Sequence, residues 1–158
     1  MIREHDLLAQ LLVEDCAAIG GCVIFRERRF AAGSLVVPGK GDDLIIGLQR
    51  GVGRLNLITK KLCMITALDV NWETHRCNDG GCDSEGRLWI STTELNHEKD
   101  GGDIYCISPG VSVSRIGEKI TIPNGIVWTA DQQRLFYTDS MTGYVFSCVY
   151  HSLKNKKR

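Results

Sequence analysis

The stretch Asp79-Gly-Gly-Cys-Asp-Ser-Glu-Gly-Arg-Leu-Trp-Ile-Ser91 decides the fold, because its pattern occurs three times along the chain. The other copies are Gly33-Ser-Leu-Val-Val-Pro-Gly-Lys-Gly-Asp-Asp-Leu-Ile-Ile-Gly47 and Asn124-Gly-Ile-Val-Trp-Thr-Ala-Asp-Gln-Gln-Arg-Leu-Phe-Tyr-Thr138. All three share one order of signals: a glycine turn, an apolar strand, a polar turn and a second apolar strand. Their starts lie 46 and 45 positions apart. This regular period indicates a repeat architecture built from short strands.

Each copy is followed by a further glycine and a strand of alternating character, at Gly53–Ile58, Gly102–Ile107 and Gly143–Val149. Short strands at regular spacing with glycine turns between them are typical of four-stranded propeller blades. A β-sandwich with coincidental spacing is the alternative, and three copies in phase favour the propeller. The sequence therefore predicts an all-β fold with about three blades of antiparallel strands.

The 158 residues hold roughly three and a half repeats, whereas propellers typically close with about four to eight blades. We therefore expect a partial propeller whose ring is not closed, spanning residues 33–150. Residues 1–32 do not repeat and form a divergent N-terminal segment, and residues 151–158 form a basic tail. An open ring exposes a strand edge and an apolar blade face, so the open edge is a candidate surface for self-association.

Composition and charge exclude several other classes of function. The 19 basic and 19 acidic residues balance, so no overall field attracts nucleic acid or an anionic membrane, and no long apolar span is present. Seven cysteines form an odd, scattered set, which argues against a disulfide scaffold. The sequence therefore predicts a cytoplasmic protein, with a nuclear location as the alternative.

The start of each blade is the place to look for a binding site, because these strand starts and their loops gather at one end of a propeller channel. Arg76 and Asn78 enter the second repeat there, and their donors and acceptors suit a polyhydroxylated or carbonyl ligand. The alternative is a capped turn in which Asp79 bonds its own backbone and His75 is a satisfied loop histidine.

Asn124 enters the third repeat at the equivalent position. Its amide oxygen suits a hard divalent cation, although Asn-Gly is also ordinary turn chemistry. One asparagine leaves both interpretations open.

Two longer segments carry a family resemblance. Arg76-Cys-Asn-Asp-Gly-Gly-Cys-Asp-Ser-Glu-Gly-Arg-Leu-Trp-Ile-Ser-Thr92 resembles a signature of the family of senescence marker protein (regucalcin), gluconolactonase and luciferin-regenerating enzyme. Pro123-Asn-Gly-Ile-Val-Trp-Thr-Ala-Asp131, followed by Leu135-Phe-Tyr-Thr-Asp-Ser140, resembles the next signature. The resemblance runs from about Ser34 to Tyr150. It implies a six-bladed propeller whose axial site holds Ca²⁺ or Zn²⁺ and hydrolyses sugar lactones.

The resemblance also implies site residues. Arg76 and Asn78 would orient substrate oxygens, and Asn124 would be one metal ligand. Asn96 aligns with a substrate-contacting glutamate of the family, and Glu94 lies two residues away from that position.

Two anionic metal ligands of the family have no counterpart in this sequence. One glutamate is expected near Ile19-Gly-Gly-Cys22, where no acidic residue stands, and the aspartate that is also the general base belongs to a blade beyond Arg158. We therefore assign no catalytic residue and expect a weak or incomplete metal site. The prediction is a truncated, impaired metal-dependent sugar-lactone hydrolase; the alternative is a non-catalytic propeller remnant acting as a calcium-binding or protein-interaction module.

Overall fold

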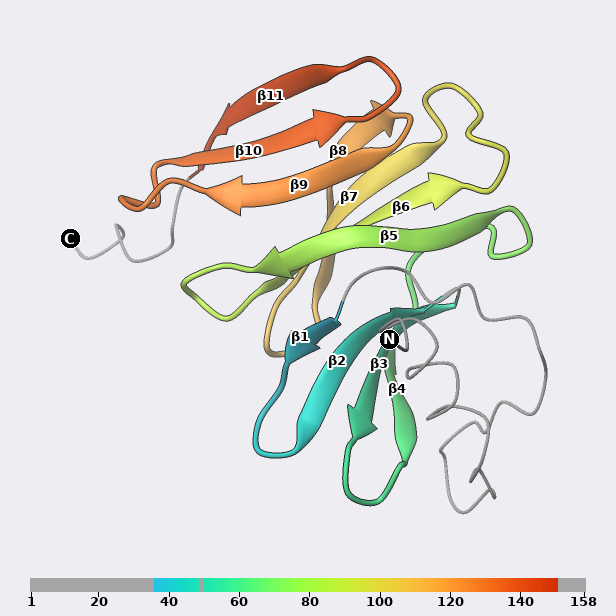
Figure 1. Ribbon diagram of the computed structural model, residues 1–158, viewed down its shortest axis with the longest axis vertical. Coiled ribbons are helices and arrows are strands. Elements are labelled where there is room, and N and C mark those ends of the chain that lie inside the picture. The colour runs from blue at the N-terminus through green and yellow to red at the C-terminus, as the bar shows by residue number, and fades with distance from the viewer. Residues whose placement is uncertain (1–35, 49, 151–158) are drawn as a thin grey trace, which may run out of the picture.

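The computed structural model describes residues 36–48 and 50–150, which contain β-strands and no helix. The strands form three separate antiparallel sheets that follow one another along the chain (Figure 1). This arrangement confirms the predicted all-β fold with three blade-like sheets. The predicted N-terminal segment 1–32, with the position near Ile19, and the basic tail 151–158 lie outside the described residues.

The first sheet has the order β1 (Val36–Pro38), β2 (Asp43–Leu48), β3 (Gly51–Asn56) and β4 (Leu62–Thr66). Its own apolar centre holds four buried aliphatic side chains: Ile46, Leu48, Leu55 and Leu62.

The second sheet has the order β5 (His75–Cys82), β6 (Leu88–Glu94), β7 (Gly102–Ile107) and β8 (Val113–Ile120). Every residue of β6 and β7 is buried. The chain reverses between β5 and β6 at Gly86, whose φ of 73° suits a residue without a side chain.

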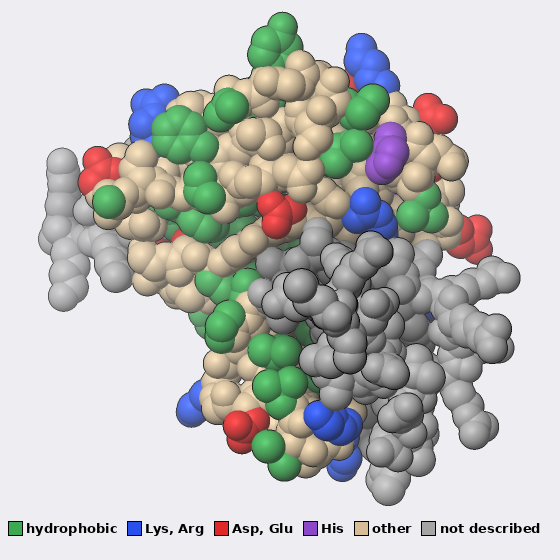
Figure 2. Space-filling view, viewed as in Figure 1, with side chains coloured by type: hydrophobic (Ala, Val, Ile, Leu, Met, Phe, Trp, Pro, Cys, Tyr) green, Lys and Arg blue, Asp and Glu red, His purple; other side chains and the backbone are tan. Residues whose placement is uncertain are grey.

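The third sheet contains β9 (Pro123–Trp128), β10 (Arg134–Asp139) and β11 (Tyr144–Val149), and β10 lies in the middle. All six residues of β11 are exposed. Hydrophobic side chains appear on the molecular surface over this sheet (Figure 2).

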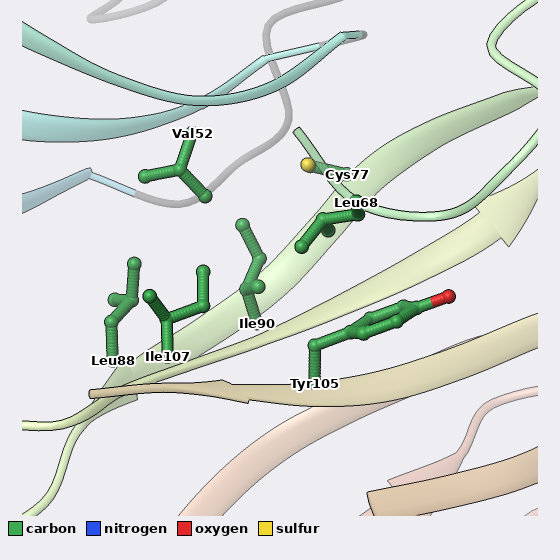
Figure 3. Close-up of a cluster of buried hydrophobic side chains, with 7 residues drawn as sticks. All are labelled: Val52, Leu68, Cys77, Leu88, Ile90, Tyr105 and Ile107. Atoms are coloured by element: carbon green, nitrogen blue, oxygen red, sulfur yellow. The ribbon is translucent and has the colours of Figure 1, made fainter. Parts of the chain in front are cut away.

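The second sheet packs between the other two, and alternate residues of β6 face opposite neighbours. Ile90 points into a cluster with Val52 and Leu68 from the first sheet and the segment after it (Figure 3). Trp89 instead joins a cluster with Ile126 and Leu135 of the third sheet. This alternation is the period of a strand that is buried on both faces.

The Asn78-Asp79-Gly80 segment is not the turn that the sequence suggested as an alternative. It lies within β5, where the pairing with β6 shifts register between Cys77 and Gly80. A Cβ atom on Gly80 would lie 2.1 Å from the carbonyl oxygen of Trp89, so glycine is required here for a close strand approach.

Candidate functional site

Arg76, Asn78 and Asn124 form a continuous hydrogen-bonded array that links the second sheet to the third. Arg76 Nη1 donates to Asn78 Oδ1 at 2.7 Å, and Asn78 Nδ2 donates to Asn124 Oδ1 at 2.9 Å. Asn78 Nδ2 also donates to the carbonyl oxygen of Pro123 at 3.0 Å. The two asparagines are 46 positions apart, so the sequence repeat places equivalent residues of neighbouring sheets in contact.

Strand pairing positions the Asn78 end of this array. Asn78 is buried at the irregularity of β5, and β5 contacts β9 directly. Ser91 Oγ lies beneath this irregularity, where it accepts from the backbone N–H of Asp79 at 2.9 Å and also donates to Pro123 O at 3.0 Å. Because one hydroxyl fastens both strand segments, β5 and β9 are held at a fixed separation.

The Asn124 end is held by its own sheet and by Asp79. Asn124 Nδ2 donates to Ser140 Oγ at 2.7 Å, and Thr138 Oγ1 donates to the Asn124 carbonyl oxygen at 3.1 Å. Asp79 Oδ2 accepts from the backbone N–H of Gly125 at 2.6 Å. The expectation that Asp79 bonds its own backbone is therefore wrong: the segment is a strand, so its carboxylate reaches the neighbouring sheet.

Asp139 fixes the loop before β9, and sequence reasoning did not single it out. The buried carboxylate accepts from the backbone N–H groups of Thr121, Ile122 and Met141 at 3.1, 3.0 and 3.2 Å. Burial alone would raise its pKa, but these three backbone hydrogen bonds outweigh that effect and hold the pKa below its ordinary value. The only sign of this role in the sequence is that Asp139 is an aspartate at the end of an apolar strand.

Arg76 keeps most of its hydrogen-bonding capacity. Its side chain is half-buried, and to the described residues it donates only through Nη1, to Asn78 Oδ1 and to the carbonyl oxygen of Cys77. A guanidinium carries five N–H donors in a planar fork. The remaining donors are therefore available to oxygens of a bound molecule.

Asn96 lies apart from this array in the exposed turn after β6. Its backbone N–H donates to Glu94 Oε2 at 2.5 Å, and its side-chain amide is 3.4 Å from Glu94 Oε1. Glu94 is buried and also accepts from the backbone N–H of Glu98, so its carboxylate caps the turn. The structure thus gives Glu94 a structural role, and a substrate role for Asn96 stays a prediction.

His75 is a satisfied structural histidine, as expected, although it begins β5 and does not lie in a loop. Its Nε2 is 2.9 Å from the carbonyl oxygen of Gly101, and its Nδ1 is 3.1 Å from that of Asn71. Both ring nitrogens therefore contact main-chain oxygens.

A groove of about 410 Å³ lies elsewhere, between the outer parts of the second and third sheets. Trp89, Tyr137 and Tyr150 line it, and the residues of the hydrogen-bonded array do not. The groove is therefore separate from the array, and the roles of Arg76, Asn78 and Asn124 stay predictions.

The described residues do not build a cation site on their own. They contain no group of three histidine, cysteine, aspartate or glutamate side chains that could hold a metal ion. Asn124 Oδ1 already accepts one hydrogen bond, which leaves this neutral oxygen one lone pair for a cation. Ca²⁺ normally takes about six to eight oxygen ligands, several of them carboxylates, so one amide oxygen does not fit the ion by itself.

Two further features of the described residues concern membrane spans and cysteines. Within the described part, no helix is long and apolar enough to cross a membrane. Cys77, Cys82, Cys106 and Cys148 are free thiols, whereas Cys63 is disulfide-bonded. The cytoplasmic location stays a prediction.

The three sheets and the array between them define a partial β-propeller with a polar cluster at its blade starts. Residues 23–158 match the family described as SMP-30/Gluconolactonase/LRE-like region, and the chain belongs to this family.

Individual relatives agree with this assignment. The chain is 29% identical over 101 residues to YvrE of Bacillus subtilis, provisionally named as a sugar lactone lactonase, covering 64% of this chain and 35% of that protein. It is 29% identical over 114 residues to regucalcin of Gallus gallus, covering 69% of this chain and 38% of regucalcin. The crystal structure of a calcium-binding protein, regucalcin, from Agrobacterium tumefaciens matches with a TM-score of 0.71 and 24% identity, covering 75% of this chain and 40% of that one. The chain spans about a third of the length of the curated relatives it matches.

Proposed function

We propose that the Arg76–Asn78–Asn124 array is the substrate-facing part of a metal-dependent sugar-lactone hydrolase site. The observation that carries the proposal is the direct hydrogen bond between the two asparagines, each of which starts a blade and lies in a family signature. Membership of the gluconolactonase-containing family supports a sugar lactone as substrate.

Each residue has a distinct role in this proposal. Arg76 presents its remaining N–H donors to the hydroxyl and carbonyl oxygens of the lactone. Asn78 is buried and fully engaged with its neighbours, so it holds Arg76 and Asn124 in register. Asn96 lies in the exposed turn after β6 and would reach the sugar from that side.

The ion contributes Lewis-acid chemistry when bound, and Asn124 Oδ1 would be one of its ligands, with Ca²⁺ or Zn²⁺ as the candidates. Because the described residues add a single neutral oxygen, we derive no catalytic step through the ion. We expect residues 1–158 alone to bind either cation weakly, with a dissociation constant above about 1 mM, and to open the lactone at the spontaneous rate.

Binding of the sugar can be tested separately from turnover. Freshly dissolved gluconolactone should shift the side-chain amide resonances of Asn78 and Asn124 in an NMR titration of the chain. Arg76→Ala should abolish these shifts. Arg54→Ala is the matched control, because Arg54 is an exposed arginine of the first sheet that pairs with Asp43. Equal shifts in the Arg76→Ala and Arg54→Ala proteins would show that Arg76 does not bind the lactone.

The metal part of the proposal is tested by calorimetric titration with Ca²⁺ and Zn²⁺ and by a lactone-opening assay with and without metal. Weak binding and spontaneous rates are the expected results. Micromolar binding, together with metal-dependent turnover that disappears in Asn124→Ala, would contradict the expectation of an impaired site.

A non-catalytic role in protein interaction is the second candidate function, and the third sheet favours it. Tyr144, Val145 and Val149 of β11 are 68%, 67% and 64% exposed, an apolar edge strand open to solvent. Such strands are ready sites for pairing with another chain, including a second copy of this one.

A further inference from the structure

Asn124-Gly125 is the only Asn-Gly pair in the sequence. Asparagine is a thermolabile residue, and a following glycine leaves its own backbone nitrogen unshielded because it has no Cβ. By sequence, Asn124 is therefore the asparagine of this chain whose side-chain amide the next backbone nitrogen can attack most easily.

The fold requires this glycine. Gly125 has a φ of 64°, in the left-handed region that other residues adopt at a cost. A Cβ atom would meet only Thr138 Oγ1 at 3.7 Å, so backbone conformation and not space restricts the position to glycine. The glycine of the labile pair therefore cannot be replaced without straining the start of β9.

The reaction at such a pair needs no cofactor. The Gly125 nitrogen loses its proton and attacks Cγ of Asn124, the Cγ–Nδ2 bond breaks, and ammonia leaves from a five-membered succinimide ring. Water then opens the ring to aspartate or isoaspartate. Two conditions must be met: the Gly125 nitrogen must release its proton, and the Asn124 side chain must rotate toward it.

The structure opposes both conditions. The Gly125 N–H donates to Asp79 Oδ2 at 2.6 Å, and loss of its proton would place an amide anion against a carboxylate. The Asn124 amide is held at both ends, because Oδ1 accepts from Asn78 Nδ2 at 2.9 Å and Nδ2 donates to Ser140 Oγ at 2.7 Å. Rotation toward Gly125 would break both hydrogen bonds.

We propose that Asn124 is a deamidation site that Asp79 and Ser140 hold in check in the folded chain. The inference rests on the chemistry of residue 124 and does not depend on the proposed function. Deamidation would place a carboxylate next to Gly125, whose N–H donates to Asp79, and would remove the amide donor to Ser140. It would thereby change the charge at the junction of β5 and β9.

The test is a time course of deamidation in the full chain at mildly alkaline pH, read by mass spectrometry of the tryptic peptide 120–134, which contains Asn124. In the folded protein the conversion should be at least about tenfold slower than in denaturant, because intramolecular attack depends steeply on geometry. Asp79→Ala should raise the rate in the folded protein by about tenfold, and Ser140→Ala should raise it less.

Asp42→Ala is the matched control, because Asp42 is an exposed aspartate in the turn before β2. This substitution should leave the rate unchanged. If Asp79→Ala does not fold, Ser140→Ala and the comparison of folded with denatured wild type still decide the question. Equal rates in folded and denatured wild type would overturn the proposal. A slower rate in Asp79→Ala would also overturn it, since Asp79 would then act as the base that removes the Gly125 proton.

Discussion

The second and third sheets come from the same sequence repeat but differ in how their strands are covered. Every residue of β6 is buried, although its second half is Ser91-Thr-Thr-Glu94, whereas every residue of the more apolar β11 is exposed. The second sheet has a neighbouring sheet on each face, and β11 is an edge strand of the third sheet. For β6 and β11, burial therefore follows from where the strand lies among the three sheets and not from how apolar its residues are.

The two sheets are nevertheless joined by a buried polar group. Asp83 Oδ2 accepts from Arg87 Nε at 2.7 Å, from Trp89 Nε1 at 2.8 Å and from Tyr150 Oη at 2.7 Å. Arg87 also donates to Tyr150 and lies over its ring. One carboxylate thus ties the turn before β6 to the end of the third sheet.

The largest effect should come from removing an aliphatic side chain between sheets. Ile90 is fully buried, so Ile90→Ala should lower the free energy of unfolding by about 2–5 kcal/mol. Val145→Ala on β11, where the side chain is 67% exposed, should change it by less than about 0.5 kcal/mol. Urea titrations of both variants measure the difference. Similar losses would show that β11 is covered in solution.

Asp83→Asn should have the next largest effect. It leaves Arg87 without its buried partner, and we expect a loss of about 3 kcal/mol in the free energy of unfolding. Asp131→Asn is the matched control, because Asp131 is fully exposed and contacts only its own turn. Urea midpoints provide the measurement. Equal midpoints for the two variants would show that Asp83 does not stabilise the contact between the sheets.

The sequence predicted the sheets better than it predicted the contacts between them. Glycine and strand signals located the repeat at Asp79 and Asn124, because turns and alternating strands are local features. The role of Asp83 depends on Tyr150, which lies 67 residues away, and no local pattern reports that contact. Asp79 was misjudged for the same reason: its partner, Gly125, belongs to another sheet.

The same contrast between repeated local patterns and contacts outside them applies to the candidate site. The pairing of Asn78 with Asn124 follows from the period of the repeat, since equivalent positions of adjacent blades face each other. The turn-capping role of Glu94 does not follow from it, because that carboxylate contacts the backbone of residues outside the repeated pattern.

Acid should destabilise the fold through Asp83 and Asp139. Burial raises the pKa of Asp83, but hydrogen bonds from Trp89, Tyr150 and Arg87 outweigh it, so that pKa, like the pKa of Asp139, is below its ordinary value. The unfolded chain therefore binds these protons more readily, and the stabilisation is present above about pH 4 and is lost as pH falls through the folded pKa values. Urea midpoints across a pH series should fall in acid, and Asp83→Asn should flatten the decline. A midpoint that rises in acid would contradict both assignments.

The smallest effect on folding, and the most direct test of β11, should come from Val145→Lys. The side chain is largely exposed, so the substitution should change the free energy of unfolding by less than about 0.5 kcal/mol. It places a charge on an apolar edge strand, and charges on edges oppose strand pairing between chains. If β11 mediates self-association, sedimentation should show a concentration-dependent increase in mass for the wild-type chain and a reduced increase for Val145→Lys. Lys61→Arg, at an exposed position before β4, keeps the charge and should behave as wild type. Identical sedimentation of wild type and Val145→Lys would mean that the exposed strand does not mediate self-association, and that β11 is an edge strand exposed to solvent without pairing to another chain.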